Sequence, residues 1–381
     1  METNVKSKVL DEFKSLASVM VNPMMREWKD NGGKIIGYFC THVPDELITA
    51  AGILPVRMRA TGSTGTELSD AFYSTINCTF PRHCLNMALN HEFDILDGLL
   101  VPNSCDHVRR IYDNWRRQLD TAFVEMFNLP KKTEEPQVMW YKDEAHILKD
   151  KLEKHFGVEI TDEKFSNAIK VHNESRRLLR QIYELRKAEA PPITGADVLA
   201  VVVAGTAIPR DKYNEMLREL LEDLKGAEGI KDYRSRIMVL GGILDEPEYM
   251  EIVEDQGGMV VTDSLCFGTR LFWADISEEG DPYEAIARYQ VQQRPTCPRS
   301  YGDQPKRRKF LMDMIKEFKV DGVIGERLLF CDPWVVEHYM NDQDLKEAGV
   351  PFLKLDREYV LSGRGQLRTR VQAFLEMLGG K

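Results

Sequence analysis

Two stretches of the chain, "FDILDGLLVPNSCDH" (residues 93–107) and "VDGVIGERLLFCDPW" (residues 320–334), place similar residues in the same order. Each contains Asp-Gly, then a short apolar run, then Cys-Asp. Short apolar runs of this kind are typical of strands that are buried on both faces of a parallel sheet. The shared order predicts two copies of one α/β unit, with Cys105 and Cys331 at equivalent positions after equivalent strands.

The flanking sequence alternates between strand and helix patterns. Further apolar runs predict strands at residues 33–40, 235–244 and 259–266, and helix patterns separate the strands. Pro44, followed by two acidic residues, is a typical first helical turn, and Gly52 is a typical helix end. A strand–helix–strand rhythm indicates parallel sheets. We therefore predict an α/β fold with two duplicated parallel-sheet domains, whose ligands bind at the carboxyl ends of the strands.

Between the two units the pattern changes to long, charged helices, which predict a helical connecting layer with a solvated face. The predicted division has four parts: an N-terminal helical segment (1–30), a first α/β domain (31–138), a helical connecting region (139–230), and a second α/β domain with a C-terminal helix (231–381).

Composition excludes several classes of function. The 381 residues carry a net charge of −10, which argues against nucleic acid as a partner because phosphate binding needs a basic face. No apolar run approaches the roughly 18 residues of a membrane span. The first residues have a charged, helical pattern without the apolar centre of a signal peptide. These features predict a cytoplasmic protein without a membrane partner.

The seven cysteines are the most informative polar residues. An odd number, dispersed along the chain, does not form a disulfide framework, and buried free thiols are one interpretation. Cys78 and Cys297 each precede a proline and an arginine, whereas Cys105 and Cys331 follow strands. Four such positions facing one cleft would suit a soft metal or an iron–sulfur cluster. Their spacing matches neither a ferredoxin nor a zinc ribbon, so spacing alone leaves both interpretations open.

Several stretches together resemble one family, the 2-hydroxyacyl-CoA dehydratase/benzoyl-CoA reductase family. The resemblance covers nearly the whole chain in the right order, except for the helical middle. The stretches that carry it are "GYFCTHVPDELITAAGILPVRM", "NCTFPRH", "VPNSCDHVRRIYDNW", "RPTCPRSY", "DGVIGERLLFCDPW" and "GQLRTRVQAFLEML".

The resemblance implies two Rossmann-like (flavodoxin-like) domains and one [4Fe-4S] cluster held by three cysteines. It also implies a paralogous cluster-bearing subunit as partner, forming a heterodimer, and a separate ATP-hydrolysing iron–sulfur activator that supplies a low-potential electron. The substrate of such proteins is an acyl-CoA thioester, which is reduced to a radical anion. Dehydratases of the family then expel water, whereas the reductases add electrons and protons to an aromatic ring.

Carried over residue by residue, the resemblance makes Cys78, Cys105 and Cys331 the cluster ligands. Cys78 with Arg82 matches the family's Cys-x-x-x-Arg pattern, and the other two match its Cys-Asp pairs. A related branch of the family holds a double-cubane cluster with six cysteines. That branch would need additional cysteines near Cys266 and Cys297, so one cluster with three protein thiolates is the favoured interpretation.

Thr41 and Glu46 are candidate catalytic residues, because they follow the first strand and would face the same cleft. An acidic residue in a first helical turn is also a common structural feature. The stretch 104–118 resembles the benzoyl-CoA reductase side of the family, which favours ring reduction. Two alternatives stay open: a 2-hydroxyacyl-CoA dehydratase subunit, and a cluster-free scaffold subunit that binds a paralogous partner.

Overall fold

The computed structural model describes residues 1–379 and shows an α/β protein with two four-stranded parallel sheets. The first sheet has the strand order β2-β1-β3-β4 and the second β6-β5-β7-β8. The strands of the first sheet are β1 (Ile35–Tyr38), β2 (Leu54–Arg57), β3 (Gly98–Pro102) and β4 (Phe123–Phe127). Those of the second are β5 (Ser235–Gly241), β6 (Gly258–Ser264), β7 (Gly322–Leu328) and β8 (Phe352–Arg357).

The two sheets have the same topology, which confirms the duplication that the sequence predicts. In both sheets the second strand lies on one side of the first strand, and the third and fourth strands lie on its other side. This order is typical of Rossmann-like domains. The strand order therefore reverses between β1 and β3 and again between β5 and β7. Open α/β sheets bind ligands outside the carboxyl ends of the strands at such a reversal.

The repeated Asp-Gly pair has the same role in both copies. Asp97 accepts a hydrogen bond from the backbone N–H of Ile35 at 2.9 Å, and Asp321 accepts one from that of Arg236 at 2.7 Å. Each aspartate thereby ties the start of its own strand to the neighbouring central strand. Gly98 follows Asp97 because a side chain there would lie within 2.8 Å of Phe123.

Helices cover both sheets and fill the space between them. Their bounds are α1 (Lys8–Ala17), α2 (Pro23–Asp30), α3 (Asp45–Ala50), α4 (Thr79–Leu89), α5 (Asp106–Gln118), α6 (Glu135–Phe156), α7 (Asp162–Leu185), α8 (Gly195–Ala204), α9 (Arg210–Lys225), α10 (Pro247–Asp255), α11 (Pro282–Arg288), α12 (Gln304–Glu317), α13 (Asp332–Glu347) and α14 (Arg364–Gly379). No described helix combines the length and the apolar character that a membrane crossing requires.

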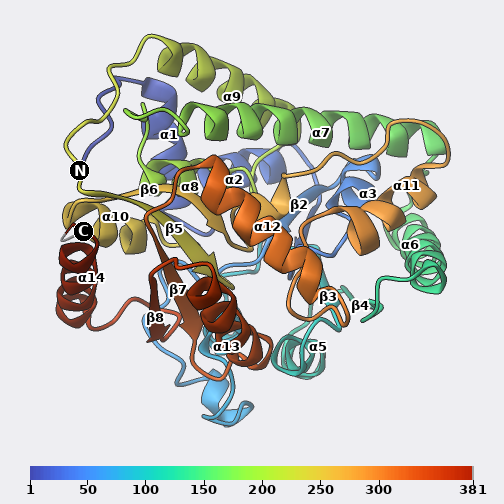
Figure 1. The fold of residues 1–381 in the computed structure, drawn as a ribbon. Helices are drawn as coiled ribbons and strands as arrows, with labels where there is room; N and C mark the ends of the chain where they lie inside the picture. The colour runs from blue at the N-terminus through green and yellow to red at the C-terminus, as the bar shows by residue number, and fades with distance from the viewer. Residues whose placement is uncertain (380–381) are drawn as a thin grey trace.

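The connecting helices join the two sheets. Figure 1 shows the long helix α7 running along one side of the molecule beside α9. It also contacts α3, which follows β1, and α11, which comes from the second half of the chain. Helix α8 is apolar apart from Asp197 and is buried on every side, and it packs against α1, α10 and β6.

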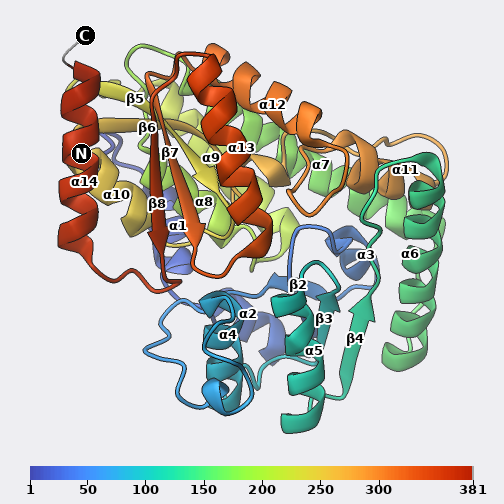
Figure 2. The ribbon, with the colours of Figure 1, turned by 60° about the horizontal axis from the view of Figure 1, so that its bottom comes forward.

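A second set of contacts holds the sheets together near the carboxyl ends of their strands. Figure 2 shows α13 beside β7 and β8, and α5 beside β3 and β4. Tyr359, after β8, donates its backbone N–H to Thr79 of α4 at 2.9 Å. Its hydroxyl accepts from the backbone N–H of Ala60 at 2.9 Å and donates to Asp245 at 2.6 Å. The carboxyl edges of both sheets therefore face a shared region.

Candidate functional site

One cavity lies between the carboxyl ends of the two sheets, and six of the seven cysteines line it. Its walls also contain Gly242 and Ile243, which follow β5, and Leu328, the last residue of β7. The cavity is thus placed at the reversal of strand order in the second sheet. The cysteines are Cys40, Cys78, Cys105, Cys266, Cys297 and Cys331.

Three of these cysteines occupy the same position relative to a helix. Cys78 is the N-cap residue of α4, Cys105 that of α5, and Cys331 that of α13. They are the three residues that the family resemblance names as ligands. The free N–H groups and the positive end of the dipole of each helix favour a negative charge at its N-terminus. Three helices therefore begin directly after cysteines that line the cavity.

The other three cysteines lie on loops. Cys266 follows β6, Cys297 lies in the loop before α12, and Cys40 follows β1. Cys40 has a φ of 67°, a left-handed conformation that non-glycine residues adopt at an energetic cost. Such a conformation is retained where the surrounding structure requires a particular side-chain direction, and here Cys40 lines the cavity. Sequence reasoning does not assign Cys40, although its position after a strand is a usable signal.

Burial shapes the chemistry of these thiols. Burial raises the pKa of Cys78 to about 12 and that of Cys105 to about 11. It also raises the pKa of Cys331 and of Cys297, since a thiolate is disfavoured between apolar walls. A cation bound to these sulfurs would favour the thiolate over the protonated thiol, and the thiols would release their protons on binding.

The cysteine sulfurs of the described residues do not form a compact group of three. Sulfurs on a single tetrahedral zinc ion lie about 3.8 Å apart, as Zn–S bonds of about 2.3 Å require. Within residues 1–379, no three cysteine sulfurs lie within 4.8 Å of one another. A polynuclear group, whose ligands are attached to different metal atoms, suits this arrangement and a donor set in which six cysteines outnumber the one histidine, His107.

Cys84, the remaining cysteine, and Arg82 of the Cys-x-x-x-Arg pattern lie outside the cavity wall. Cys84 is buried in α4 but does not line the cavity. Arg82 is also in α4, and its guanidinium pairs with Asp70 at 2.7 Å and donates to Thr66 at 3.1 Å. The Arg82 side chain therefore stabilises the loop before α4, the loop that leads to Cys78.

The structure does not bring Thr41 or Glu46 into the wall of this cavity. Thr41 is buried, and its hydroxyl oxygen accepts a hydrogen bond from Arg294 at 2.7 Å. Glu46 is completely buried and forms an ion pair with Arg176 of α7. Each side chain is already engaged by an arginine, which is a structural role. A catalytic role for either residue stays a prediction.

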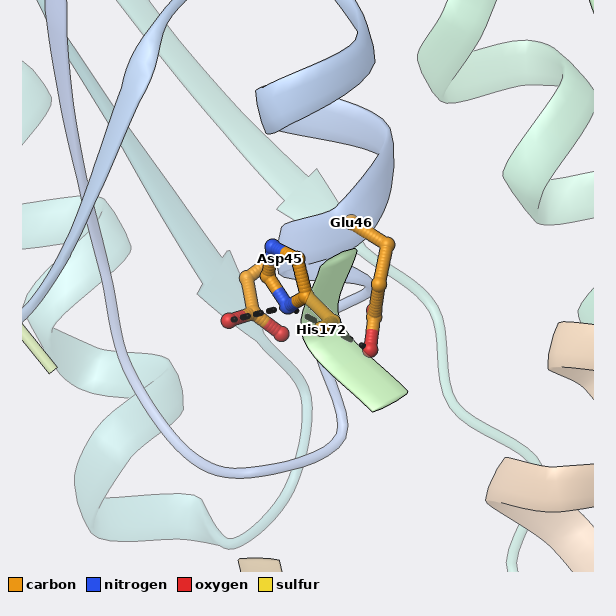
Figure 3. A group of neighbouring side chains, drawn as sticks. All are labelled: Asp45, Glu46 and His172. Carbon is orange, nitrogen blue, oxygen red and sulfur yellow. Dashed lines mark ion pairs between the residues drawn. The ribbon is translucent and has the colours of Figure 1, made fainter. Parts of the chain in front are cut away.

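Glu46 belongs to a group that resembles a cation site. Figure 3 shows Asp45 and Glu46 on either side of His172, whose Nδ1 lies 3.6 Å and 3.7 Å from the two carboxylates. However, Arg176 pairs with Glu46, and Arg210 lies 3.4 Å from Asp45. Two guanidinium charges already balance the two carboxylates, and they would repel an added cation. We interpret the group as a buried network that joins α3 to the connecting helices.

The fold and this site define a class of protein: a duplicated parallel α/β protein with a cysteine-lined cavity at the carboxyl ends of its strands, suited to a thiolate-bound metal cofactor. The family model for the 2-hydroxyglutaryl-CoA dehydratase D-component matches residues 40–378, and the chain belongs to that family.

Three relatives align with 86% or more of this chain. It is 30% identical to one subunit of the benzoyl-CoA reductase of Thauera aromatica, over 86% of this chain and 87% of the relative. It is 26% identical to the (R)-phenyllactyl-CoA dehydratase beta subunit of Clostridium sporogenes, over 97% and 99%. It is 27% identical to the beta subunit of the (R)-2-hydroxyglutaryl-CoA dehydratase of Acidaminococcus fermentans, over 98% and 99%. The chain is thus homologous to subunits of enzymes that act on CoA thioesters.

Proposed function

We propose that the cavity binds an iron–sulfur cofactor and that the chain is the subunit of a multi-subunit enzyme that delivers low-potential electrons to an acyl-CoA thioester. The observation that carries this proposal is the convergence of six cysteines on one cavity at the carboxyl edge of the sheets. An all-sulfur donor set is the one that iron–sulfur clusters use.

Cys78, Cys105 and Cys331 are the proposed ligands of a [4Fe-4S] cluster. All three are N-cap residues, so the helices α4, α5 and α13 offset the negative charge of a thiolate-bound cluster. Three protein ligands leave one iron with an open position, which supplies Lewis-acid chemistry next to the electron source. The protein's own part is to hold the thiolates, to exclude water with apolar walls, and to leave a side open to substrate.

A larger cofactor is a second candidate, and a specific observation favours it. Cys40, Cys266 and Cys297 line the same cavity and form a second set of three thiols. The sequence resemblance favours three ligands, because the chain has a single cysteine in each of the two stretches around Cys266 and Cys297. The resemblance does not assign Cys40 as a ligand. Six thiols match the ligand number of the double-cubane branch. Iron content separates the two candidates: about four iron atoms per chain for one cubane, or about eight for two.

Ring reduction is the proposed reaction. Its support is the identity of 30% to a benzoyl-CoA reductase subunit, compared with 26% and 27% to two dehydratase subunits. Each of these relatives is named as one subunit of a larger enzyme. We therefore further propose a paralogous cluster-bearing partner and an ATP-hydrolysing iron–sulfur activator. Dehydration of a 2-hydroxyacyl-CoA is the alternative reaction, since both begin with transfer of one electron to the thioester.

The test is an anaerobic assay of the chain with its partner subunit, the activator and ATP. Ring reduction predicts ATP-dependent conversion of benzoyl-CoA to a cyclic diene. Dehydration of a 2-hydroxyacyl-CoA without consumption of benzoyl-CoA would overturn the reductase assignment but not the cofactor. Colourless protein without iron after anaerobic purification and reconstitution would instead favour the cluster-free scaffold.

A further inference from the structure

Arg270 is a buried arginine that donates a hydrogen bond to a cysteine of the cavity. Its Nη2 donates to the sulfur of Cys266 at 3.1 Å and to the carbonyl of Gly241 at 2.6 Å. Its Nη1 donates to the carbonyl of Ser264 at 2.6 Å, and the guanidinium lies 5.1 Å from the ring centre of Trp334. These contacts hold the guanidinium in one position, with 2% of the residue exposed.

Arg57 brings a second guanidinium to the same side of the cavity. It is the last residue of β2, lines the cavity, and donates from Nη1 to the carbonyl of Cys266 at 2.6 Å. Its guanidinium stacks 3.7 Å from the ring centre of Phe267. Its Nη2 is buried and has no hydrogen-bond partner among the described residues. A buried donor without a partner is costly, so this N–H is available to a group bound in the cavity.

Both arginines lack an anionic oxygen among their hydrogen-bond partners. In the described part of the chain those partners are carbonyl oxygens, one hydroxyl and one sulfur. A buried cation with only neutral partners carries a desolvation cost, which a nearby anion offsets. The carboxylates of Asp263 and Glu326 lie near Arg270, but they accept hydrogen bonds from Thr269 and Arg357. The unpartnered Nη2 of Arg57 therefore makes this side of the cavity suited to a negatively charged occupant.

We infer that Arg270, with Arg57 beside it, is a positioning residue that sets the reduction potential of the bound cofactor through Cys266. The inference rests on the proposed iron–sulfur function in its larger form, in which Cys266 is one of the six thiol ligands. A hydrogen bond to a cluster sulfur and a nearby positive charge both stabilise the reduced state, which carries the greater negative charge. Loss of the Arg270 guanidinium should therefore lower the midpoint potential and leave the ligand cysteines in place.

The experiment compares the wild-type chain with Arg270→Gln, Arg270→Lys and a matched control, Arg236→Gln. Arg236 is also a buried arginine that bonds to carbonyl oxygens, at the amino end of β5 and outside the cavity wall. Each protein is reconstituted anaerobically with iron and sulfide, its iron content is measured, and its midpoint potential is determined by redox titration followed by electron paramagnetic resonance. Thermal unfolding of each protein checks that it is folded.

We expect Arg270→Gln to keep the wild-type iron content and to shift the reduction equilibrium about tenfold toward the oxidised state, which is about 59 mV for one electron. Arg270→Lys should recover part of the shift because it keeps the charge, and Arg236→Gln should show none. If Arg270→Gln does not fold, Arg270→Lys and Arg57→Gln carry the same test with the same direction of shift.

A wild-type midpoint in the folded Arg270 and Arg57 variants would overturn this inference and leave the proposed function intact. An equal shift in Arg236→Gln would overturn it too, because the effect would then not depend on contact with Cys266. Wild-type protein that binds no iron would overturn the proposed function, and this inference with it.

Discussion

His107 and Asp332 meet across the two halves of the molecule, with Nε2 of the histidine 3.2 Å from the carboxylate of the aspartate. His107 is the second residue after Cys105, and Asp332 is the first after Cys331. The contact therefore joins the first turns of α5 and α13, which begin directly after two of the proposed ligands. The repeated Cys-Asp motifs come together here in space, so the cavity is formed by both domains and belongs to neither alone.

Substitution of the proposed ligands should remove the cofactor. Cys105→Ser and Cys331→Ser should each lose most of the iron and the visible absorption of the anaerobically reconstituted protein, because an alcohol is a poor iron ligand compared with a thiolate. Cys84→Ser is the matched control, since Cys84 is buried in the same region but outside the cavity wall. Iron quantification per chain is the measurement, and equal loss in all three variants would refute the assignment.

Cys40→Ser should distinguish the two candidate cofactors. A double-cubane cofactor predicts that the iron content falls from about eight toward about four per chain, because one set of three thiols is incomplete. A single cubane bound to the other three cysteines predicts about four iron atoms before and after the substitution. Iron and sulfide analysis on the same preparation provides the measurement.

The ion pair between Glu46 and Arg176 should matter for stability. Glu46→Gln leaves the guanidinium buried without its counter-charge, and loss of one member of a buried pair typically costs about 3–5 kcal/mol. Glu347→Gln is the control, since its pair with Arg308 is exposed and screened by solvent, so its loss should change the free energy of unfolding little. Denaturant unfolding measures both. Unchanged stability in Glu46→Gln together with lost activity would instead favour the catalytic role.

The hydroxyl of Tyr359 should contribute to the attachment between the domains. Tyr359→Phe removes the donor to Asp245 and the acceptor for the backbone N–H of Ala60, and each unsatisfied buried group costs about 1–3 kcal/mol. The exposed Tyr339 provides the control substitution, Tyr339→Phe, which should change the free energy of unfolding little. A loss in Tyr359→Phe no greater than in the control would show that the hydroxyl is not needed.

His338 should make the stability depend on pH. Burial beside the rings of Trp334 and Phe352 lowers the pKa of His338 to about 4, whereas its ordinary pKa is 6.5. The folded state therefore binds fewer protons than the unfolded state between these pH values. The free energy of unfolding is therefore highest above pH 6.5, and it falls as the pH drops toward 4, by up to roughly 3 kcal/mol.

His338→Gln should reduce this pH dependence because the amide does not titrate. Chemical unfolding of both proteins at several pH values between 7.5 and 4.5 measures the two slopes. Identical slopes in the wild type and the variant would show that other groups account for the acid sensitivity.

The order of strands and helices is readable from the sequence because each element carries its own local signal. The helix start at Asp45, the helix end near Gly52 and the duplicated Asp-Gly strands depend on neighbouring residues only, and the structure confirms them. The local pattern does not predict strand β4, since it is only partly buried in its middle and Glu125 interrupts its apolar pattern. An edge strand gains much of its stability from its partner, here β3, which a local pattern does not reveal.

The sequence by itself determined the duplicated parallel α/β architecture and identified the Cys-Asp pairs at the ends of β3 and β7, because strand periodicity and Asp-Gly motifs act over a few residues. Only the tertiary structure decided which side chains share the cavity. It brought Cys40 and Cys266 to the cavity and directed Glu46 toward Arg176, away from the cavity wall. Contacts between residues far apart in the chain depend on how the two sheets pack against each other. The spacing of residues along the sequence does not predict that packing.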